Sequence, residues 1–312
     1  MASLVNVSAQ RAVPPRSFPV RTAPERAEVV LPERPTATER FIAERIEPVF
    51  RDFRYLQHSV DHAGLVHAAA HLRGLTVRAV SEGHLTFELN GTVIGGMTET
   101  VTTLLSAQGR TVTDSQELIR EHLKLMDVPR AGKAPSPELL QLCAFVVGDE
   151  LVAAQLRVPF YVIGDGQSTV ERLVEAEMER WRTHVLLARR LPQLSDARME
   201  SLTARPDEVP SRGRLLILGE DAWSGSGSLP VDVTDLLSAE VAGVAVSGLR
   251  AMPGVYAGEV RMQASGVETA AEAEVITVKP DVNIQAYHFP AYGNPRDVAS
   301  AIVEQLLERA SK

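Results

Sequence analysis

The chain has 312 residues, of which 45% are hydrophobic and 23% charged, with a net charge of -8 and a single cysteine. This size and composition suit one large domain or two ordinary ones. The negative charge excludes a general binder of nucleic acid or anionic membranes, the lone Cys143 excludes an intrachain disulfide framework, and no apolar run is long enough to span a bilayer. We therefore expect a cytoplasmic protein without nucleic-acid or membrane partners.

Residues 1–37 are rich in proline and lack sustained periodicity, which predicts a disordered or loosely packed arm. A short amphipathic helix is predicted from Thr38 to about Pro48. A second helix is predicted from Asp61 to Arg73, with Gly74 as its C-cap.

Two strand-like alternations follow, at residues 75–80 and 85–89, and Asn90-Gly91 predicts a tight hairpin turn. A third helix is expected to begin near Asp114 and to stop before Pro129. Residues 130–137 then form a short polar linker, and nothing between 128 and 142 supplies the glycine-rich backbone that cradles phosphates.

The segment CAFVVGDELVAAQLRVPFYVIGDGQSTVERLV, residues 143–174, predicts a hairpin turned at Gly148-Asp149, a third strand and a helix opened by the capping box Ser168-x-x-Glu171. Its apolar start predicts a buried, unreactive Cys143. Further elements are predicted along the rest of the chain: a strand at 214–219, the segment Pro230–Asp235, a helix at 238–252, and strands at 255–262 and 275–278. A Ser/Gly loop at 224–228 is read as a mobile linker.

The chain closes with a loop containing His288, Tyr292 and Gly293 and with a helix. Asn294 is the predicted N-cap, Pro295 the first helical residue, and Asp297 lies at the positive end of the helix dipole.

These phrases resemble the ATP-grasp ligases, in particular the branch with cyanophycin synthetase and the bifunctional glutathione synthetases. The resemblance covers about residues 60–130 and 142–307, and its most specific part is the segment from Cys143 to Val174. It implies an α+β protein with a shortened ATP-grasp fold that lacks the glycine-rich lid subdomain. The implied divisions are an arm (1–37), a small pre-ATP-grasp α/β domain (38–112), a helix and linker (113–137), and a C-terminal antiparallel sheet subdomain with packed helices (138–312).

The resemblance also implies functional residues. Arg120 keeps a charge near the second of two family lysines that reach the nucleotide, and Gln116 replaces the first. Glu259 replaces a family aspartate that binds magnesium, whereas Thr277 and Lys279 replace the other two magnesium ligands. Magnesium requires hard oxygen ligands, so we hypothesise that Lys279 pairs with Glu259 across adjacent strands instead.

Four residues are implied on the substrate side: Arg157, His288, Tyr292 and Arg296. For His288 and Tyr292 the alternative is loop packing, and for Arg296 it is a salt bridge near a helix N-terminus. We assign no catalytic residue.

ATP-grasp ligases form amide bonds with ATP and magnesium, and this chain lacks much of that machinery. The first hypothesis is a degenerate member that binds a small carboxylate or amino-acid-like ligand, or a partner enzyme. The second is an active ligase with a rearranged or partner-completed site, for which ATP and magnesium would be the cofactors. A homo-oligomer is also expected, because loss of the lid would expose an apolar sheet face.

Overall fold

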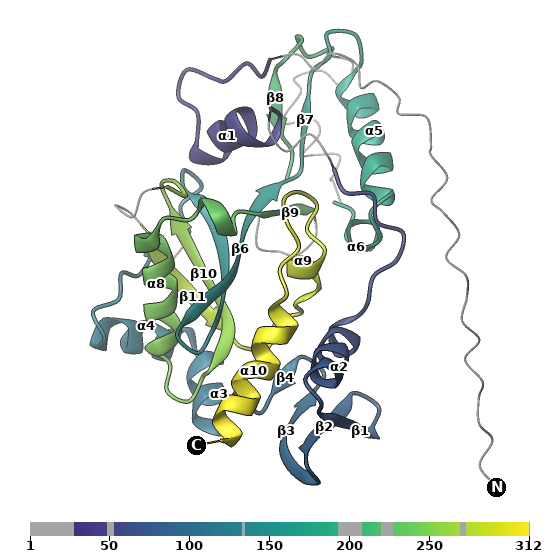
Figure 1. Ribbon diagram of the computed structural model, residues 1–312. Helices are drawn as coiled ribbons and strands as arrows, with labels where there is room; N and C mark the ends of the chain where they lie inside the picture. Colours follow the sequence, from purple (N-terminus) through teal and green to yellow (C-terminus); the bar gives the residue numbers. More distant parts are fainter. Residues whose placement is uncertain are drawn as a thin grey trace, which may run out of the picture.

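A computed structural model describes residues 28–48, 53–132, 135–192, 208–219, 227–268 and 273–311. Within these ranges the chain forms a five-stranded sheet, a four-stranded sheet and a two-stranded sheet, with helices packed against them. Figure 1 shows the five-stranded sheet in the middle, the four-stranded sheet at the bottom and the two-stranded sheet at the top. The predicted α+β architecture is confirmed.

The central sheet is antiparallel, and its strand order is β11-β10-β5-β6-β9. Its middle strand β5 is buried along its whole length, in keeping with its almost continuous apolar sequence. The predicted hairpin between β5 and β6 is present, and Gly148 has the positive φ of 57° that its turn requires. The strands are β5 (Leu140–Val147), β6 (Glu150–Pro159), β9 (Ser228–Asp232), β10 (Ala257–Ala264) and β11 (Glu274–Lys279).

One face of this sheet is apolar and packs on helix α8 (Ala239–Arg250). Leu142, Leu156 and Val260 on this face belong to one buried hydrophobic cluster with Val241 and Leu249 of α8. Ser238 caps the helix, as its position before the apolar stripe predicts. Burial of this face is the main stabilising contact of the sheet.

The small sheet, with strand order β1-β2-β3-β4, has its core completed by the end of the chain. Phe87 of the small sheet, Phe145 of β5 and Ile302 of α10 lie in one buried cluster. The hairpin turn predicted at Asn90-Gly91 is confirmed by positive φ angles of 52° and 82°. The elements are α2 (His62–Leu72), β1 (Thr76–Ser81), β2 (His84–Leu89), β3 (Thr92–Thr98), β4 (Val101–Thr102), α3 (Ala107–Thr113), α4 (Gln116–Leu125), α9 (Gln285–His288) and α10 (Val298–Ala310).

The top of the molecule contains the two-stranded sheet and the start of the described chain. The helix predicted from Thr38 begins one residue earlier, at Ala37, because Thr36 forms the capping box, and it continues as a π-helix. Phe41 and Ile46 of this segment pack in the same cluster as the central sheet. The elements are α1 (Ala37–Phe41), η1 (Ile42–Ile46), β7 (Tyr161–Ile163), α5 (Val170–Arg182), α6 (Val185–Ala188), β8 (Leu215–Ile217) and η2 (Thr234–Leu236).

Two predicted helix caps are wrong. Ser168 is bound by the carboxylate of Asp165, so Thr169 caps α5 instead. Asn294 hydrogen-bonds to Asp235 through its side chain, and α10 begins after the N-cap Asp297. In each case the side chain of the expected cap residue hydrogen-bonds to a carboxylate instead of to the backbone at the start of the helix.

The connection between α4 and β5 is short. Its described residues, 126–132 and 135–139, contain no helix or regular strand. Arg130 instead forms a single bridge with Val275, and the backbone of Ala131 donates to the Val275 carbonyl at 2.9 Å. The linker therefore covers part of the exposed edge of β11, which would otherwise present unpaired backbone groups.

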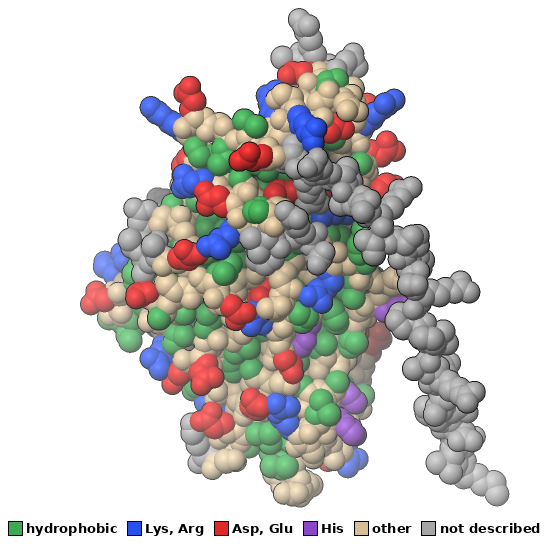
Figure 2. All heavy atoms as spheres, turned by 45° about the horizontal axis from the view of Figure 1, so that its top comes forward, with side chains coloured by type: hydrophobic (Ala, Val, Ile, Leu, Met, Phe, Trp, Pro, Cys, Tyr) green, Lys and Arg blue, Asp and Glu red, His purple; other side chains and the backbone are tan. Residues whose placement is uncertain are grey.

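The surface carries both signs of charge. Figure 2 shows Lys and Arg side chains interspersed with Asp and Glu over the visible face. Among the described residues, no helix is long and apolar enough to cross a membrane. The predicted arm falls largely on residues 1–27, outside the described ranges.

Stability is expected to fall as the pH falls below about 6.5, in part because of His62. Burial lowers the pKa of His62 from 6.5 to about 4, and its Nδ1 accepts a hydrogen bond from the Ile284 backbone at 3.3 Å. Between these two values the unfolded chain binds a proton that the folded chain does not. The free energy of unfolding should therefore drop by about 2 kcal/mol between about pH 7 and pH 5 from this residue alone.

Urea unfolding of wild-type and H62N protein at both pH values tests this expectation. Asparagine keeps an acceptor for the Ile284 N–H but does not titrate, so H62N should lose this part of the pH dependence. H67N is the matched control, since His67 is exposed. Equal pH dependence in H62N and wild type would contradict the assignment.

Candidate functional site

The face of the central sheet opposite α8 carries a row of polar side chains, one from each strand. The register places Thr277, Arg261, Cys143, Gln155 and Asp232 side by side across β11, β10, β5, β6 and β9. Directly opposed residues of an antiparallel sheet point to the same face, so these five side chains share one surface. We call the surface formed by this row and its neighbours on the same side the polar face.

At one end of the polar face, the apolar residues Phe145 and Ala153 are covered by α9 and α10. The ring of Tyr287 on α9 packs edge-on against Phe145, with 5.5 Å between their centroids. The homo-oligomer was expected because this side of the sheet would be apolar and exposed. The described strands show polar groups there instead, so that argument is wrong, and the oligomeric state stays a prediction.

Glu259 of β10 is the central charged group of the polar face. It is 2% exposed and directly opposite Lys279 of β11. Its Oε1 accepts from Nε of Arg261 at 2.8 Å, and its Oε2 accepts from the Tyr287 hydroxyl at 2.8 Å. Lys279 lies on the same face as Glu259, as the hypothesised pair requires, but among the described residues the ion pair of this carboxylate is with Arg261, which the sequence prediction did not include.

The residues around Glu259 do not fit a magnesium ion. Its oxygens already accept from a guanidinium and a hydroxyl, and the neighbouring cations repel a divalent ion. Thr277 and Lys279 add one hydroxyl and one ammonium, not the carboxylates that the ion prefers. Within the described ranges, no group of three His, Cys, Asp or Glu side chains could hold a metal ion.

Cys143 and Arg157 lie beside this carboxylate. Burial and the charge of Glu259 raise the pKa of the Cys143 thiol to about 12, so it is neutral at physiological pH and a poor nucleophile. The prediction that Cys143 is buried is confirmed.

Arg157 hydrogen-bonds the thiol and lies within electrostatic reach of Glu259 and Tyr287. Of the four predicted substrate-side residues, Arg157 is the one that the fold brings to the polar face beside Glu259.

Arg120 contacts the linker, and Gln116 contacts the edge of β11. Nη1 of Arg120 donates to the carbonyls of Ala131 and Gly132, each at 2.9 Å. Nε2 of Gln116 donates to the carbonyl of Ile276 at 2.6 Å, on the edge of β11. The nucleotide-binding role implied for Arg120 stays a prediction.

His288 and Tyr292 make packing contacts. The backbone N–H of Ala299 donates to Nε2 of His288 at 3.2 Å, and burial lowers the pKa of this histidine. The ring of Tyr292 is 1% exposed, and its hydroxyl accepts from Arg180 at 2.7 Å. Both contacts match the loop-packing alternative.

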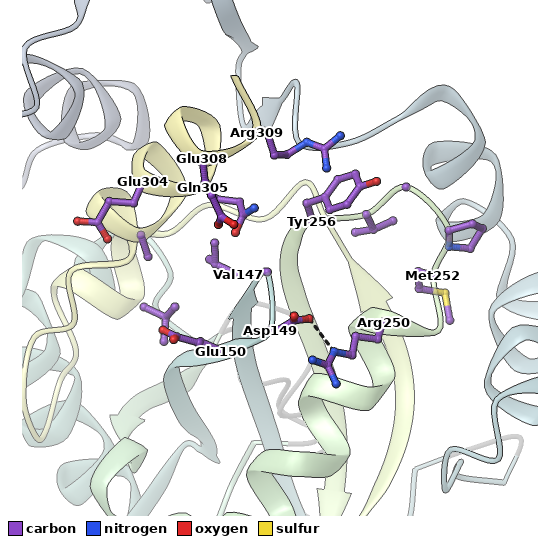
Figure 3. Close-up of a pocket in the computed structure, with 16 residues that line it drawn as sticks. Val147, Asp149, Glu150, Arg250, Met252, Tyr256, Glu304, Gln305, Glu308 and Arg309 are labelled. Carbon is purple, nitrogen blue, oxygen red and sulfur yellow. Dashed lines mark hydrogen bonds and ion pairs between the residues drawn. The ribbon is translucent and has the colours of Figure 1, made fainter. Parts of the chain in front are cut away.

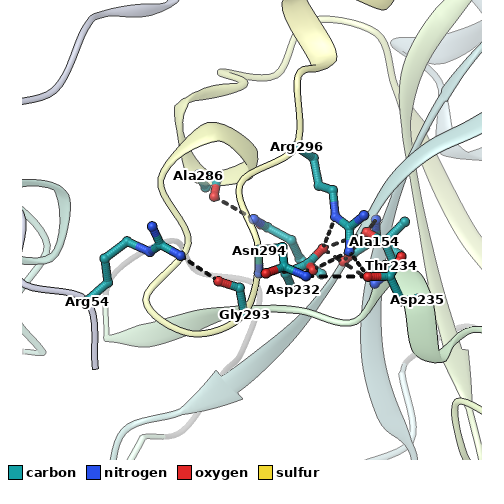
Figure 4. Close-up of polar contacts among 10 residues, drawn as sticks. Arg54, Ala154, Asp232, Thr234, Asp235, Ala286, Gly293, Asn294 and Arg296 are labelled. Carbon is teal, nitrogen blue, oxygen red and sulfur yellow. Dashed lines mark hydrogen bonds and ion pairs between the residues drawn. The ribbon is translucent and has the colours of Figure 1, made fainter. Parts of the chain in front are cut away.

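Arg296 joins the closing loop to the end of β9 (Figure 4). Its Nε and Nη2 donate to the two oxygens of Asp232 at 3.0 and 2.8 Å, and Nη2 also donates to Asp235 at 2.6 Å. Arg54 donates to the Gly293 carbonyl of the same loop at 2.7 Å. The predicted salt bridge is present, with two carboxylates from a distant segment as partners.

A hollow of about 770 Å³ opens away from these residues, at the β5–β6 turn and the last turns of α10. Figure 3 shows side chains of both charges around it, with Arg309 over the ring of Tyr256 and Arg250 paired with Asp149. None of the predicted site residues lines this hollow. Residues 224–226 of the predicted Ser/Gly loop (224–228) lie outside the described ranges.

No protein-family model matches the chain. Over 184 residues it is 28% identical to the glutathione biosynthesis bifunctional protein GshAB of Lactiplantibacillus plantarum, a match that covers 53% of this chain and 23% of the relative. Over 176 residues it is 28% identical to a cyanophycin synthetase of a Nostoc species, covering 52% of this chain and 19% of the relative. The chain thus spans less than a quarter of the length of these relatives.

A solved structure agrees on the fold. The bifunctional glutathione synthetase of Pasteurella multocida superposes with a TM-score of 0.63 over 80% of this chain and 44% of that one, at 15% identity. The chain therefore has the ATP-grasp fold, and over about half of its length its sequence is related to the ligase branch that includes cyanophycin synthetase and the bifunctional glutathione synthetases.

Proposed function

We propose that this protein is a ligase-like member of the ATP-grasp branch that does not form amide bonds and instead binds a small carboxylate or amino-acid-like ligand. This proposal rests on the contacts of Glu259, whose two carboxylate oxygens accept hydrogen bonds from Arg261 and Tyr287. Phosphoryl transfer requires a divalent ion and converging cations around the phosphates. A carboxylate neutralised by a fixed guanidinium does not recruit that ion.

The short connection between α4 and β5 supports the same proposal. Arg120 and Gln116 are engaged with the linker and the β11 edge. Both side chains therefore serve to close the fold in this structure. A nucleotide at this place would have to displace those contacts, at a cost of about 1 kcal/mol for each hydrogen bond.

The proposal is tested by calorimetry with ATP at about 1 mM, with excess magnesium and then with EDTA, together with an assay of phosphate release. A cyanophycin synthetase in the same buffer is the positive control. We expect no binding heat and no phosphate above the blank in either condition. Magnesium-dependent binding with phosphate release would overturn the proposal.

The second candidate is an active ATP-dependent amide ligase whose nucleotide site is completed by another polypeptide. One observation favours it: over about half of this chain the sequence is 28% identical to a glutathione biosynthesis bifunctional protein and to a cyanophycin synthetase. Such an enzyme would release phosphate only after the completing polypeptide is added. Repeating the assay with a candidate partner enzyme separates the two functions.

A further inference from the structure

The polar face contains more positive than negative charge near its centre. Arg157, Arg261 and Lys279 lie there with one carboxylate, Glu259. The guanidinium groups of Arg157 and Arg261 are close enough for their positive charges to repel each other. Two further carboxylates lie on this face: Glu274 at the end of β11, which accepts from Gln263 at 2.8 Å, and Asp232 of β9, which is paired with Arg296.

Two of these cations have no carboxylate partner among the described residues. No ion pair joins Arg157 or Lys279 to an acidic side chain in the part of the chain that the structure describes. Both are partly exposed, and the side chain of Arg261 is 29% exposed, so an incoming anion can reach them. Three cations around the single carboxylate of Glu259 leave an excess of positive charge, which favours an anionic ligand.

Buried polar atoms on the same face also lack a partner. They are Oγ1 of Thr277, Oε1 of Gln155 and Oε1 of Gln141, whose residues are 7%, 1% and 9% exposed. The amide nitrogens of both glutamines are already used, donating to the carbonyls of Ala286 and Ser136. The two free oxygens therefore require hydrogen-bond donors, and a buried polar atom left unsatisfied costs about 1–3 kcal/mol.

The register connects these atoms to the cations. Thr277 is directly opposite Arg261, and Gln155 is two residues from Arg157 on the same face of β6. Gln141 is two residues from Cys143, which Arg157 hydrogen-bonds. Acceptors without a donor thus lie on the same face as Arg157, which has no carboxylate ion pair among the described residues.

We propose that Arg261 and Lys279, fixed beside Glu259, supply the positive charge that a divalent metal ion would otherwise supply, and that with Arg157 they form a metal-independent site for a small carboxylate that also carries O–H or N–H donors. This inference rests on the proposed function, because it uses the same face and requires that magnesium is not held there. The carboxylate binds the cations, and the donors of the ligand satisfy Gln155 and Gln141. Glu259 orients Arg261 and takes no part in metal binding.

The probes are L-malate and succinate, which have the same two carboxylates and differ by one hydroxyl. Binding to the whole chain is measured by calorimetry and by the shift of the unfolding temperature, in EDTA and then in excess magnesium. We expect L-malate to bind equally well in both conditions and more tightly than succinate. No binding of L-malate, or binding that requires magnesium, would overturn the proposal.

Variants locate the site and separate it from a metal site. R157Q and K279Q should each weaken L-malate binding by about tenfold, as expected for loss of a charged hydrogen bond. The matched control K124Q removes an exposed lysine on α4 and should bind as wild type does.

Loss of L-malate binding in EDTA and its return with magnesium would overturn the proposal, since that outcome fits a metal held by Glu259. The proposed function and the carboxylate site can be overturned separately. Phosphate release from ATP would overturn the proposed function. Carboxylate binding that is absent or magnesium-dependent, without phosphate release, would overturn this site alone.

Discussion

Replacing Arg296 with alanine is expected to lower the free energy of unfolding by about 3 kcal/mol. Arg296 makes a two-bond contact with Asp232, which is 5% exposed, and a further contact with Asp235. Without the guanidinium, the buried carboxylate of Asp232 keeps only its hydrogen bonds to Thr234 and to the Asn294 backbone. An incompletely paired buried charge is the costly result.

Urea unfolding at pH 7 measures this loss. R250A is the matched control, because Arg250 pairs with Asp149 where both side chains are more than half exposed. Removing an exposed pair should cost less than about 1 kcal/mol. The double variant R296A/D232N should recover part of the stability, since a neutral amide carries no buried charge. Equal losses in R296A and R250A would show that the closing loop does not depend on this contact.

Replacing Glu259 with alanine is expected to have an even larger effect, a loss of about 4 kcal/mol. The substitution leaves the Tyr287 hydroxyl without its acceptor and Arg261 without its carboxylate partner on β10. It also removes the negative charge that lies within electrostatic reach of Arg157. E259Q retains an acceptor for Tyr287, so it should cost about half as much.

The control for this series is E268A, which breaks the exposed ion pair of Glu268 with Arg45 and should cost less than about 1 kcal/mol. The unfolding midpoint of wild-type protein is then compared with and without EDTA. A metal bound to the folded state would stabilise it by mass action, so a midpoint that falls in EDTA would contradict our reading of Glu259. We expect no change.

Local sequence patterns predicted most of the secondary structure. The turns at Asn90-Gly91 and Gly148 were found because both adopt positive φ, which few other residue pairs allow. The helix α8 was predicted at residues 238–252 from its apolar stripe, and the structure adds Ser238 as its N-cap. These features depend on residues close together in sequence, and short-range sterics and hydrogen bonds decide them.

The wrong cap of α10 has a different cause. Asp297, not Asn294, caps α10 because Asp232 and Asp235 bind the residues just before it. Those carboxylates lie about sixty residues earlier in the chain, so no local rule includes them. Arg261 was overlooked as the partner of Glu259 although its spacing of two residues on a strand places both on one face.

The sequence by itself determined most of the helices and strands, though not α3 or α9, together with the kinship with a ligase branch and the lack of a second carboxylate at the expected magnesium ligands. Only the tertiary structure decided that Arg261 and Tyr287 donate hydrogen bonds to Glu259 and that Arg120 contacts the linker. It also decided that Arg157 lies near Glu259 on the polar face, whereas Arg296 is paired with Asp232. The reason is that strand register and loop closure bring together groups far apart in sequence. Their charges and hydrogen bonds depend on distances that no local pattern records.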